Sequence, residues 1–121
     1  MAIRELIGVY DADGTIWGEV SYWIGARLGR QHCSLCDITH GLVSMKSEWR
    51  DCRDSLPVPF VTYHRNDQPD DVRTCIGERL PAVVARTDRG VEFLVGPQQL
   101  ADCHADPRAL SELLRSLLVG R

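Results

Sequence analysis

The sequence predicts a single α/β domain spanning residues 1–121, in which helices pack on a sheet in two or three layers. Apolar segments that end at polar turn residues predict strands over residues 4–10 and 58–64. Two further strand-like runs flank a tight turn at Gly90 and predict a hairpin. Segments with apolar residues three and four apart predict the helices. The expected order is strand, helix in two pieces, strand, helix, strand, strand, helix.

The amino-terminal part of the chain is expected to form one strand and a helix in two pieces. An apolar run ends at a pair of aspartates and a glycine, as a buried strand does at a turn, and this predicts a strand over residues 4–10. Five apolar residues at helical spacing predict a helix over residues 16–28. They are Ile16, Val20, Trp23, Ile24 and Leu28. The periodicity is interrupted over residues 30–43, and a shorter helix then runs from near Ser44 until Pro57 ends it.

The remaining elements are predicted by composition and by capping residues. Residues 58–64 are rich in β-branched and aromatic side chains, which favours a strand. Pro69 lies near the first turn of a short helix within residues 68–79. After the hairpin, Asp106 is expected to cap the last helix and Pro107 to begin it. The apolar stripe of that helix consists of Leu110, Leu113, Leu114, Leu117 and Leu118.

The element order, together with the stretch "RLPAVVARTDRGVEFLVG", resembles the thioredoxin-like fold. In that family a cis-proline precedes the third strand, a glycine-containing hairpin leads to the fourth, and a last helix packs over the sheet. The resemblance assigns these places to Pro81, Gly90 and residues 107–118, and it implies a cis bond between Leu80 and Pro81. The expected fold class is therefore an α/β, two-layer or three-layer thioredoxin-like sandwich of order β-α-(α)-β-α-β-β-α.

Composition and charge argue against several classes of partner. The 121-residue chain has a formal net charge of -3 and its arginines form no basic stripe, so we expect no nucleic-acid partner. No segment approaches the roughly 20 apolar residues that span a bilayer, so we expect no membrane partner. The first residues do not resemble a signal peptide, and we therefore expect a cytoplasmic protein. The oligomeric state is left open.

The cysteines supply the first hypothesis about chemistry. Five cysteines, an odd number in a chain without an apparent export signal, argue against an all-disulfide framework. The stretch "HCSLCDITH" holds two cysteines and two histidines within nine residues. If this stretch is helical, Cys33, Cys36 and His40 share one face. A C-x-x-C pair can close a small disulfide ring, and a helix start or a nearby imidazole stabilises the thiolate. We therefore predict thiol-disulfide exchange, with Cys33 attacking, Cys36 resolving, and His40 or His32 favouring the thiolate.

This redox hypothesis needs no cofactor, and its partner would be a thiol or disulfide of another protein or of a small molecule. In thioredoxins the C-x-x-C directly follows the first strand, whereas here it comes about twenty residues later. The alternative is a protein that binds zinc or another soft metal, because two thiolates and an imidazole are three of four tetrahedral ligands. Cys33, Cys36 and His40 would supply them. Candidates for the fourth ligand are His32, His64, Cys75, Cys103 and His104.

A second resemblance concerns the aspartates. The stretch "LIGVYDADGT" resembles the nucleophile motif of the haloacid-dehalogenase phosphatases, which implies that Asp11 attacks phosphorus and holds magnesium while Asp13 serves as general acid and base. The family pattern also needs a later hydroxyl, for which Thr62 could stand, then a lysine and an acidic pair. The only lysine, Lys46, precedes Thr62, and no later strand ends in paired acids. We therefore interpret the aspartates as a strand-to-helix turn.

Some other residues receive structural interpretations. His64 and Arg65 end the second strand and could line a site beside the first, but a solvated turn is the favoured interpretation. Cys52 and Cys75 are expected in helices, buried and not reactive. Trp49 is expected to pack on the sheet, because large aromatic residues at helical spacing usually belong to the core.

Overall fold

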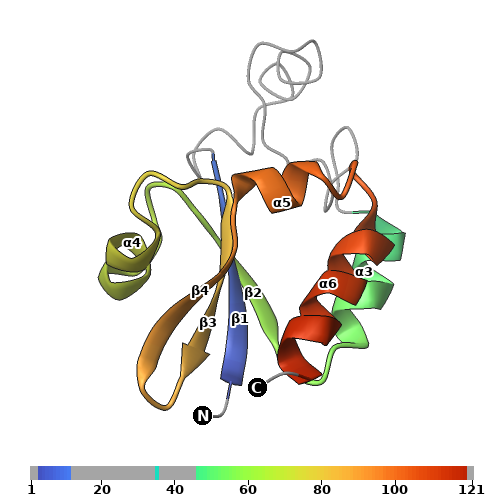
Figure 1. Ribbon diagram of the computed structural model, residues 1–121, viewed down its shortest axis with the longest axis horizontal. Coiled ribbons are helices and arrows are strands. Elements are labelled where there is room, and N and C mark those ends of the chain that lie inside the picture. The colour runs from blue at the N-terminus through green and yellow to red at the C-terminus, as the bar shows by residue number, and fades with distance from the viewer. Residues whose placement is uncertain (1–2, 12–34, 36–45, 120–121) are drawn as a thin grey trace, which may run out of the picture.

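The structure is a computed structural model, and it describes residues 3–11, 35 and 46–119. These residues form a four-stranded sheet of strand order β2-β1-β3-β4 (Figure 1). The strands are β1 (Ile3–Tyr10), β2 (Phe60–His64), β3 (Ala82–Thr87) and β4 (Gly90–Val95). Strand β1 is parallel to β2 and antiparallel to β3, and β3 is antiparallel to β4. The sheet is mixed, and the prediction of an α/β fold is confirmed.

Helices cover both faces of this sheet (Figure 1). Helices α3 (Ser47–Asp54) and α6 (Pro107–Val119) pack side by side on one face. Helix α4 (Asp70–Ile76) lies on the other face, against β3 and β4. The short helix α5 (Pro97–Ala101) lies across one end of the sheet. The described part of the chain therefore has three layers, with the sheet in the middle.

Three local features that the sequence predicted are present in the structure. The Asp106 carboxylate accepts the backbone N–H of Arg108 at 3.0 Å, which confirms the predicted cap of α6. Gly90 begins β4 with φ at 120°, the positive value that the tight hairpin requires. The peptide bond between Leu80 and Pro81 is cis, and that prediction is also confirmed.

Two boundaries differ from the sequence prediction. Strand β2 begins at Phe60 and not at Val58, because Pro59 has no N–H to donate to a neighbouring strand. The carbonyl of Pro59 still accepts the backbone N–H of Leu6 at 2.8 Å. Helix α4 ends at Ile76, since the following glycine has φ at 63° and the chain turns away there.

One helix was not predicted and another lies beyond what the structure describes. Helix α5 was missed, although Pro97 stands at its first turn and the Gln99 side chain accepts the backbone N–H of Gly96 at 3.0 Å. The signal was present in the residues "GPQQ", but five residues are too few for a periodic pattern. The helix predicted over residues 16–28 lies outside the described residues.

Two apolar clusters hold the sheet between its helices. The larger cluster lies on the α3 and α6 face and includes Leu6, Tyr10, Leu35, Trp49, Phe60, Val83, Leu110 and Leu114. The smaller cluster lies on the α4 face and consists of Ile7, Val9, Val72, Ile76, Ala82 and Val84. Strand β1 contributes to both, because successive side chains point to opposite faces. This explains why residues 6–10 of β1 include no charged or polar side chain other than the Tyr10 hydroxyl. Trp49 is fully buried and packs edge-on against Phe60 at 5.1 Å between ring centroids, as expected.

All four strands begin or end at one end of the sheet, where loops connect them to the neighbouring elements (Figure 1, top). Strands β1 and β2 end at this edge, β3 begins there directly after Pro81, and β4 ends there just before α5. We call it the carboxyl edge. The stretch that holds the C-x-x-C follows β1 in the chain. Loops at the carboxyl ends of parallel strands commonly form binding and catalytic sites, so the candidate site is sought here.

Candidate functional site

Most residues of the predicted cysteine site lie outside the described residues. They are His32, Cys33, Cys36 and His40, together with Asp13 of the aspartate motif. The structure describes Leu35, which stands between the two cysteines, and it describes Asp11 and the end of β2. Leu35, Asp11 and the end of β2 are therefore the residues from which the candidate site is described below.

Leu35 is tied to the sheet. It is helical, fully buried, and a member of the apolar cluster between the sheet and helices α3 and α6. A Cβ atom added at Gly8 of β1 would lie 3.1 Å from Cδ2 of Leu35 and 2.9 Å from Cζ of Phe60. Both side chains can approach β1 this closely because Gly8 has no side chain. The residue between the two cysteines is therefore anchored on the α3 and α6 face.

The end of β2 carries a histidine-aspartate pair. Oδ2 of Asp67 lies 3.1 Å from Nδ1 of His64, and Oδ1 of Asp67 accepts the backbone N–H of His64 at 2.5 Å. Two contacts thus hold the carboxylate against the ring. A carboxylate at Nδ1 favours the tautomer with the proton on Nδ1 and the lone pair on Nε2.

A second ion pair joins the ends of the two parallel strands. Asp11 lies in a bend directly after β1, and its Oδ1 is 3.3 Å from Nη1 of Arg65, which follows β2. Thr62, which the phosphatase resemblance would use, lies on β2 opposite Gly8 and is exposed. The only lysine, Lys46, donates to the carbonyl of Ala105 at 2.9 Å and so links the start of α3 to the loop before α6. The Arg65 contact gives Asp11 a role in connecting β1 to β2.

Sequence analysis interpreted His64 and Arg65 as a solvated turn and did not identify their partners. The side chain of His64 is only 24% exposed. Gln68 is buried and its amide nitrogen donates to the carbonyl of Arg65 at 3.1 Å, while its Oε1 accepts no hydrogen bond from the described residues. The missed signal is the spacing from His64 to Asp67, at which an aspartate can turn back to bind a nearby backbone N–H.

Two of the three described cysteines have thiols of low reactivity. Cys52 and Cys75 lie in α3 and α4 and are half-buried, and Cys103 is buried before α6. Burial raises the pKa of the Cys75 thiol and of the Cys103 thiol, which keeps both protonated and poorly nucleophilic. Cys75 also packs on the α4 face, the side of the sheet opposite Leu35.

No metal centre is evident in this part of the chain. Among residues 3–11, 35 and 46–119, no three His, Cys, Asp or Glu side chains come together in a group that could hold a metal ion. Of the possible fourth zinc ligands, His64, Cys75, Cys103 and His104 are described and His32 is not.

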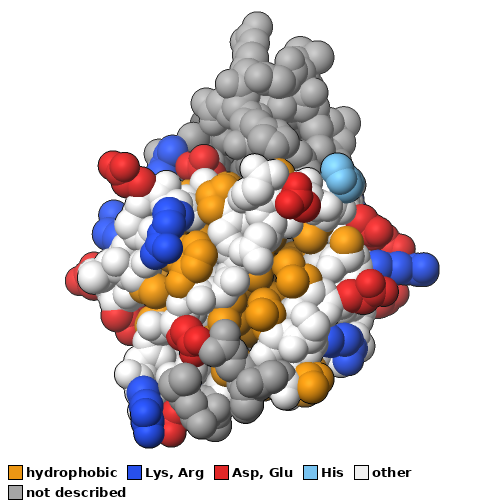
Figure 2. All heavy atoms as spheres, viewed as in Figure 1, with side chains coloured by type: hydrophobic (Ala, Val, Ile, Leu, Met, Phe, Trp, Pro, Cys, Tyr) orange, Lys and Arg blue, Asp and Glu red, His pale blue; other side chains and the backbone are white. Residues whose placement is uncertain are grey.

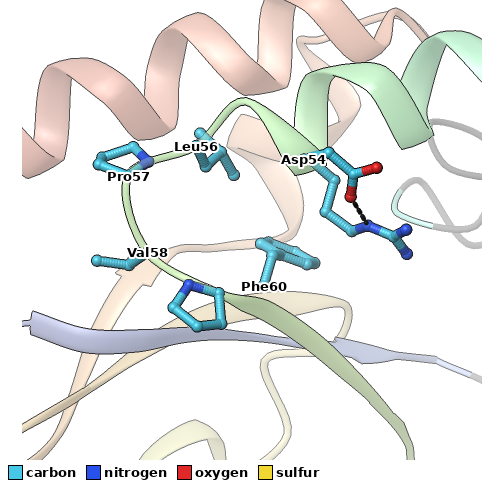
Figure 3. A pocket seen from close by; sticks show the side chains of 7 residues that line it. Asp54, Leu56, Pro57, Val58 and Phe60 are labelled. Carbon is cyan, nitrogen blue, oxygen red and sulfur yellow. Dashed lines mark hydrogen bonds and ion pairs between the residues drawn. The ribbon is translucent and has the colours of Figure 1, made fainter.

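A surface depression lies elsewhere in the described part of the chain. It has a volume of about 590 Å³ and is open to solvent, at the connection between α3 and β2 (Figure 3). Its lining residues are Arg53, Asp54, Leu56, Pro57, Val58, Pro59 and Phe60. Arg53 and Asp54 pair with each other at 3.2 Å, and no histidine or cysteine lines the depression. It lies at the amino end of β2, away from His64, and lacks a reactive group.

The surface in Figure 2 shows apolar side chains along the edge strand β4 and beside α6, with charged side chains around them. Val91 and Phe93 of β4 are half-buried there, and the guanidinium of Arg79 lies 3.9 Å from the centre of the Phe93 ring. This contact covers part of the apolar surface by a cation-π interaction. It ties α4 to β4 and needs no ligand to explain it.

Comparison of the chain with protein-family models, with curated proteins and with solved structures finds no match. No helix within the described ranges has both the length and the apolar character needed to cross a bilayer. The functional argument therefore starts from the residues of the carboxyl edge.

Proposed function

We propose that this protein is a thioredoxin-like thiol-disulfide exchange protein that uses Cys33 and Cys36. The observation that carries the proposal is the position of Leu35, which is helical and fully buried over Gly8 and Phe60. Leu35 stands between the two cysteines in the sequence. A C-x-x-C pair is short enough in the chain to close a small disulfide ring.

The arrangement of the described elements supports the thioredoxin-like part of the proposal. Pro81 directly precedes β3, a glycine hairpin joins β3 to β4, and α6 packs over the sheet at the end of the chain. These are the three features that the sequence resemblance assigned to Pro81, Gly90 and residues 107–118. The mixed sheet also places the start of β3 beside the end of β1, since Ala82 pairs with Val9.

The proposed reaction needs no cofactor. The thiolate of Cys33 attacks one sulfur of a partner disulfide, forming a mixed disulfide and releasing the first partner thiolate. The thiolate of Cys36 then attacks the Cys33 sulfur and releases the second. The partner gains two electrons and becomes a dithiol, while Cys33 and Cys36 lose two electrons and become a disulfide. His40 or His32 would favour the attacking thiolate. The partner would be a cytoplasmic protein or small molecule with an exchangeable disulfide.

The first test counts thiols and metal on the same protein. Freshly purified protein is analysed for metal, then equilibrated in glutathione buffers of graded potential before the free thiols are counted. The expected result is no metal and the joint loss of two of the five thiols. Cys33→Ser and Cys36→Ser should each abolish this paired loss, while the control Cys75→Ser should leave it intact.

Two other results would overturn the proposal. About one equivalent of metal, with thiols that react only after chelation, would assign Cys33, Cys36 and His40 to a zinc site, with His32 as a candidate fourth ligand. Five free thiols at every potential, together with no metal, would favour the hypothesis that Asp11 and Asp13 form a phosphatase site. The phosphatase hypothesis would then require magnesium-dependent hydrolysis of a phosphate ester that Asp11→Asn abolishes.

A further inference from the structure

We propose that Lys46 holds closed a strained turn, His104–Ala105, and that opening of this turn uncovers the thiol of Cys103. The turn lies in the connection between α5 and α6, which passes beside the start of α3 (Figure 1). It is a conformational device that controls access to one thiol. All of its residues lie in the described part of the chain, and it does not depend on the proposed dithiol chemistry.

The backbone of the turn has a conformation that most residues avoid. The φ angle is 51° at His104 and 59° at Ala105. Glycine adopts positive φ freely, whereas a residue with a Cβ atom is disfavoured there by steric contact with its own backbone. Both residues are exposed, so burial of their side chains does not impose this conformation. Hydrogen bonds from the surrounding structure therefore have to hold the turn closed.

One hydrogen bond ties the turn to a distant part of the chain. The backbone N–H of His104 donates to the last residue of α5 at 3.0 Å, and that of Asp106 donates to the carbonyl of Cys103 at 3.0 Å, but both contacts are local. Nζ of Lys46 donates to the carbonyl of Ala105 at 2.9 Å, across 59 residues of sequence. A charged donor makes a stronger hydrogen bond than a neutral one. The Lys46 contact is therefore the one that fixes the turn against α3.

The thiol that directly precedes the turn lies just below the surface. Cys103 is 6% exposed, and its Sγ donates to the carbonyl of Gln99 at 3.5 Å. A depression of about 300 Å³ that is open to solvent reaches this thiol, and its other lining residues are Gln99, Asp102, Ala109 and Leu113. A small movement of the turn would therefore expose Sγ to an oxidant or an electrophile, whereas the closed turn protects it.

The first test measures how fast iodoacetamide labels Cys103 in the native, reduced protein, with each cysteine followed by peptide mapping. Lys46→Met removes the donor, and we expect about fivefold faster labelling of Cys103, the change that loss of one hydrogen bond produces in an opening equilibrium. Glu48→Gln is the matched control. It removes a neighbouring contact between α3 and α6, the pair with Arg108 at 3.3 Å, and should leave the labelling rate within about twofold.

Two results would overturn the role of Lys46. An unchanged rate for Cys103 in Lys46→Met would mean that the contact does not hold the turn. Equal acceleration at Cys52, Cys75 and Cys103 would mean that the substitution loosens the whole fold.

The strain is tested by Ala105→Gly. Glycine removes the steric cost of positive φ and so stabilises the closed turn, and we expect labelling of Cys103 to become slower by about twofold or more. In the variant that combines Ala105→Gly with Lys46→Met, the two effects should largely offset each other. Labelling that is equally fast or faster in Ala105→Gly would show that strain does not favour opening.

A measurement on the unmodified chain applies even if a variant does not fold. Native-state hydrogen exchange reports the opening of single backbone amides. The amides of His104 and Asp106 donate within the turn, so they should open together with the Cys103 thiol. We expect the opening constant from these amides and that from thiol labelling to agree within about threefold. A thiol that becomes accessible while these amides stay protected would overturn the proposal.

Discussion

Two groups of charged residues in this protein differ in what they connect. Arg86 of β3 contacts Asp71 of α4 at 2.7 Å and Glu5 of β1 at 3.3 Å, so it joins two strands and a helix. His64 and Asp67 are three residues apart, and their contact joins the end of β2 to its own turn. The Arg86 contacts connect elements that are far apart in the sequence, whereas the Asp67 contact orients the His64 ring.

The difference indicates distinct roles. The hydrogen bond to Arg86 lowers the pKa of Asp71, and the same bond raises the pKa of Arg86, so folding and ionisation are linked in that group. The contact between His64 and Asp67 is local, and it favours the tautomer of the His64 ring that carries the proton on Nδ1. We expect changes in the Arg86 group to affect the stability of the fold more than changes in the His64 group.

The largest effect is expected from removing the anchor itself. Leu35→Ala leaves a cavity in the cluster on the α3 and α6 face and should lower the free energy of unfolding by about 2–5 kcal/mol. Denaturant unfolding measures this change. Val119→Ala, at a residue that is 88% exposed, is the control and should change stability by less than about 0.5 kcal/mol. A loss below about 1 kcal/mol in Leu35→Ala would contradict the burial of Leu35 in this cluster.

A smaller loss should follow from filling the space under the anchor. Gly8→Ala places a methyl group against Phe60 and Leu35 and should cost about 1–3 kcal/mol of stability. Gly96→Ala is the comparison, because a Cβ there would lie 3.4 Å from Cζ of Phe93, an ordinary contact. Thermal unfolding of both variants tests the difference. Equal stability of Gly8→Ala and the unmodified protein would show that Leu35 has room to move away from β1.

The described thiols should react more slowly than those of the proposed site. Burial raises the pKa of Cys75 and Cys103, so at pH 7.5 both should be alkylated several-fold more slowly in the native protein than in urea. Peptide mapping after brief labelling reads each cysteine separately. Rapid labelling of Cys75 in the native protein would contradict this prediction and would indicate a reactive thiol on the α4 face.

The smallest effect is expected in the Arg86 group. The pKa of Asp71 is lower in the folded protein, so its ion pair stabilises the fold above the unfolded pKa near 3.8 and is lost as pH falls through the folded value. Asp71→Asn should therefore slightly reduce the urea midpoint at pH 7, and the difference should vanish in strong acid. Asp70→Asn removes a neighbouring carboxylate for which no contact with Arg86 is described and serves as the control. A difference that persists in strong acid would mean that Asp71 acts through packing and not through its charge.

Elements whose determinants lie within a few residues were predictable from the sequence. The start of α6 follows from the Asp106 cap, and the hairpin follows from the positive φ of Gly90. The apolar run that ends at Tyr10 predicted a buried strand, and β1 contributes buried residues to both clusters. Where local signals were short or mixed, the prediction was less accurate, as for α5 and for the start of β2 at Phe60.

The amino-acid sequence by itself therefore determined the kinds and order of the described elements other than α5, because periodicity, caps and turn residues act through neighbours in the chain. Only the tertiary structure decided that Leu35 lies over Gly8 and that His64 stands beside Tyr10. These contacts depend on the parallel register of β1 and β2, which joins segments more than fifty residues apart. A shift of one residue in that register would turn His64 to the opposite face of the sheet. No local pattern encodes the register, since it is set by how whole strands and helices pack together.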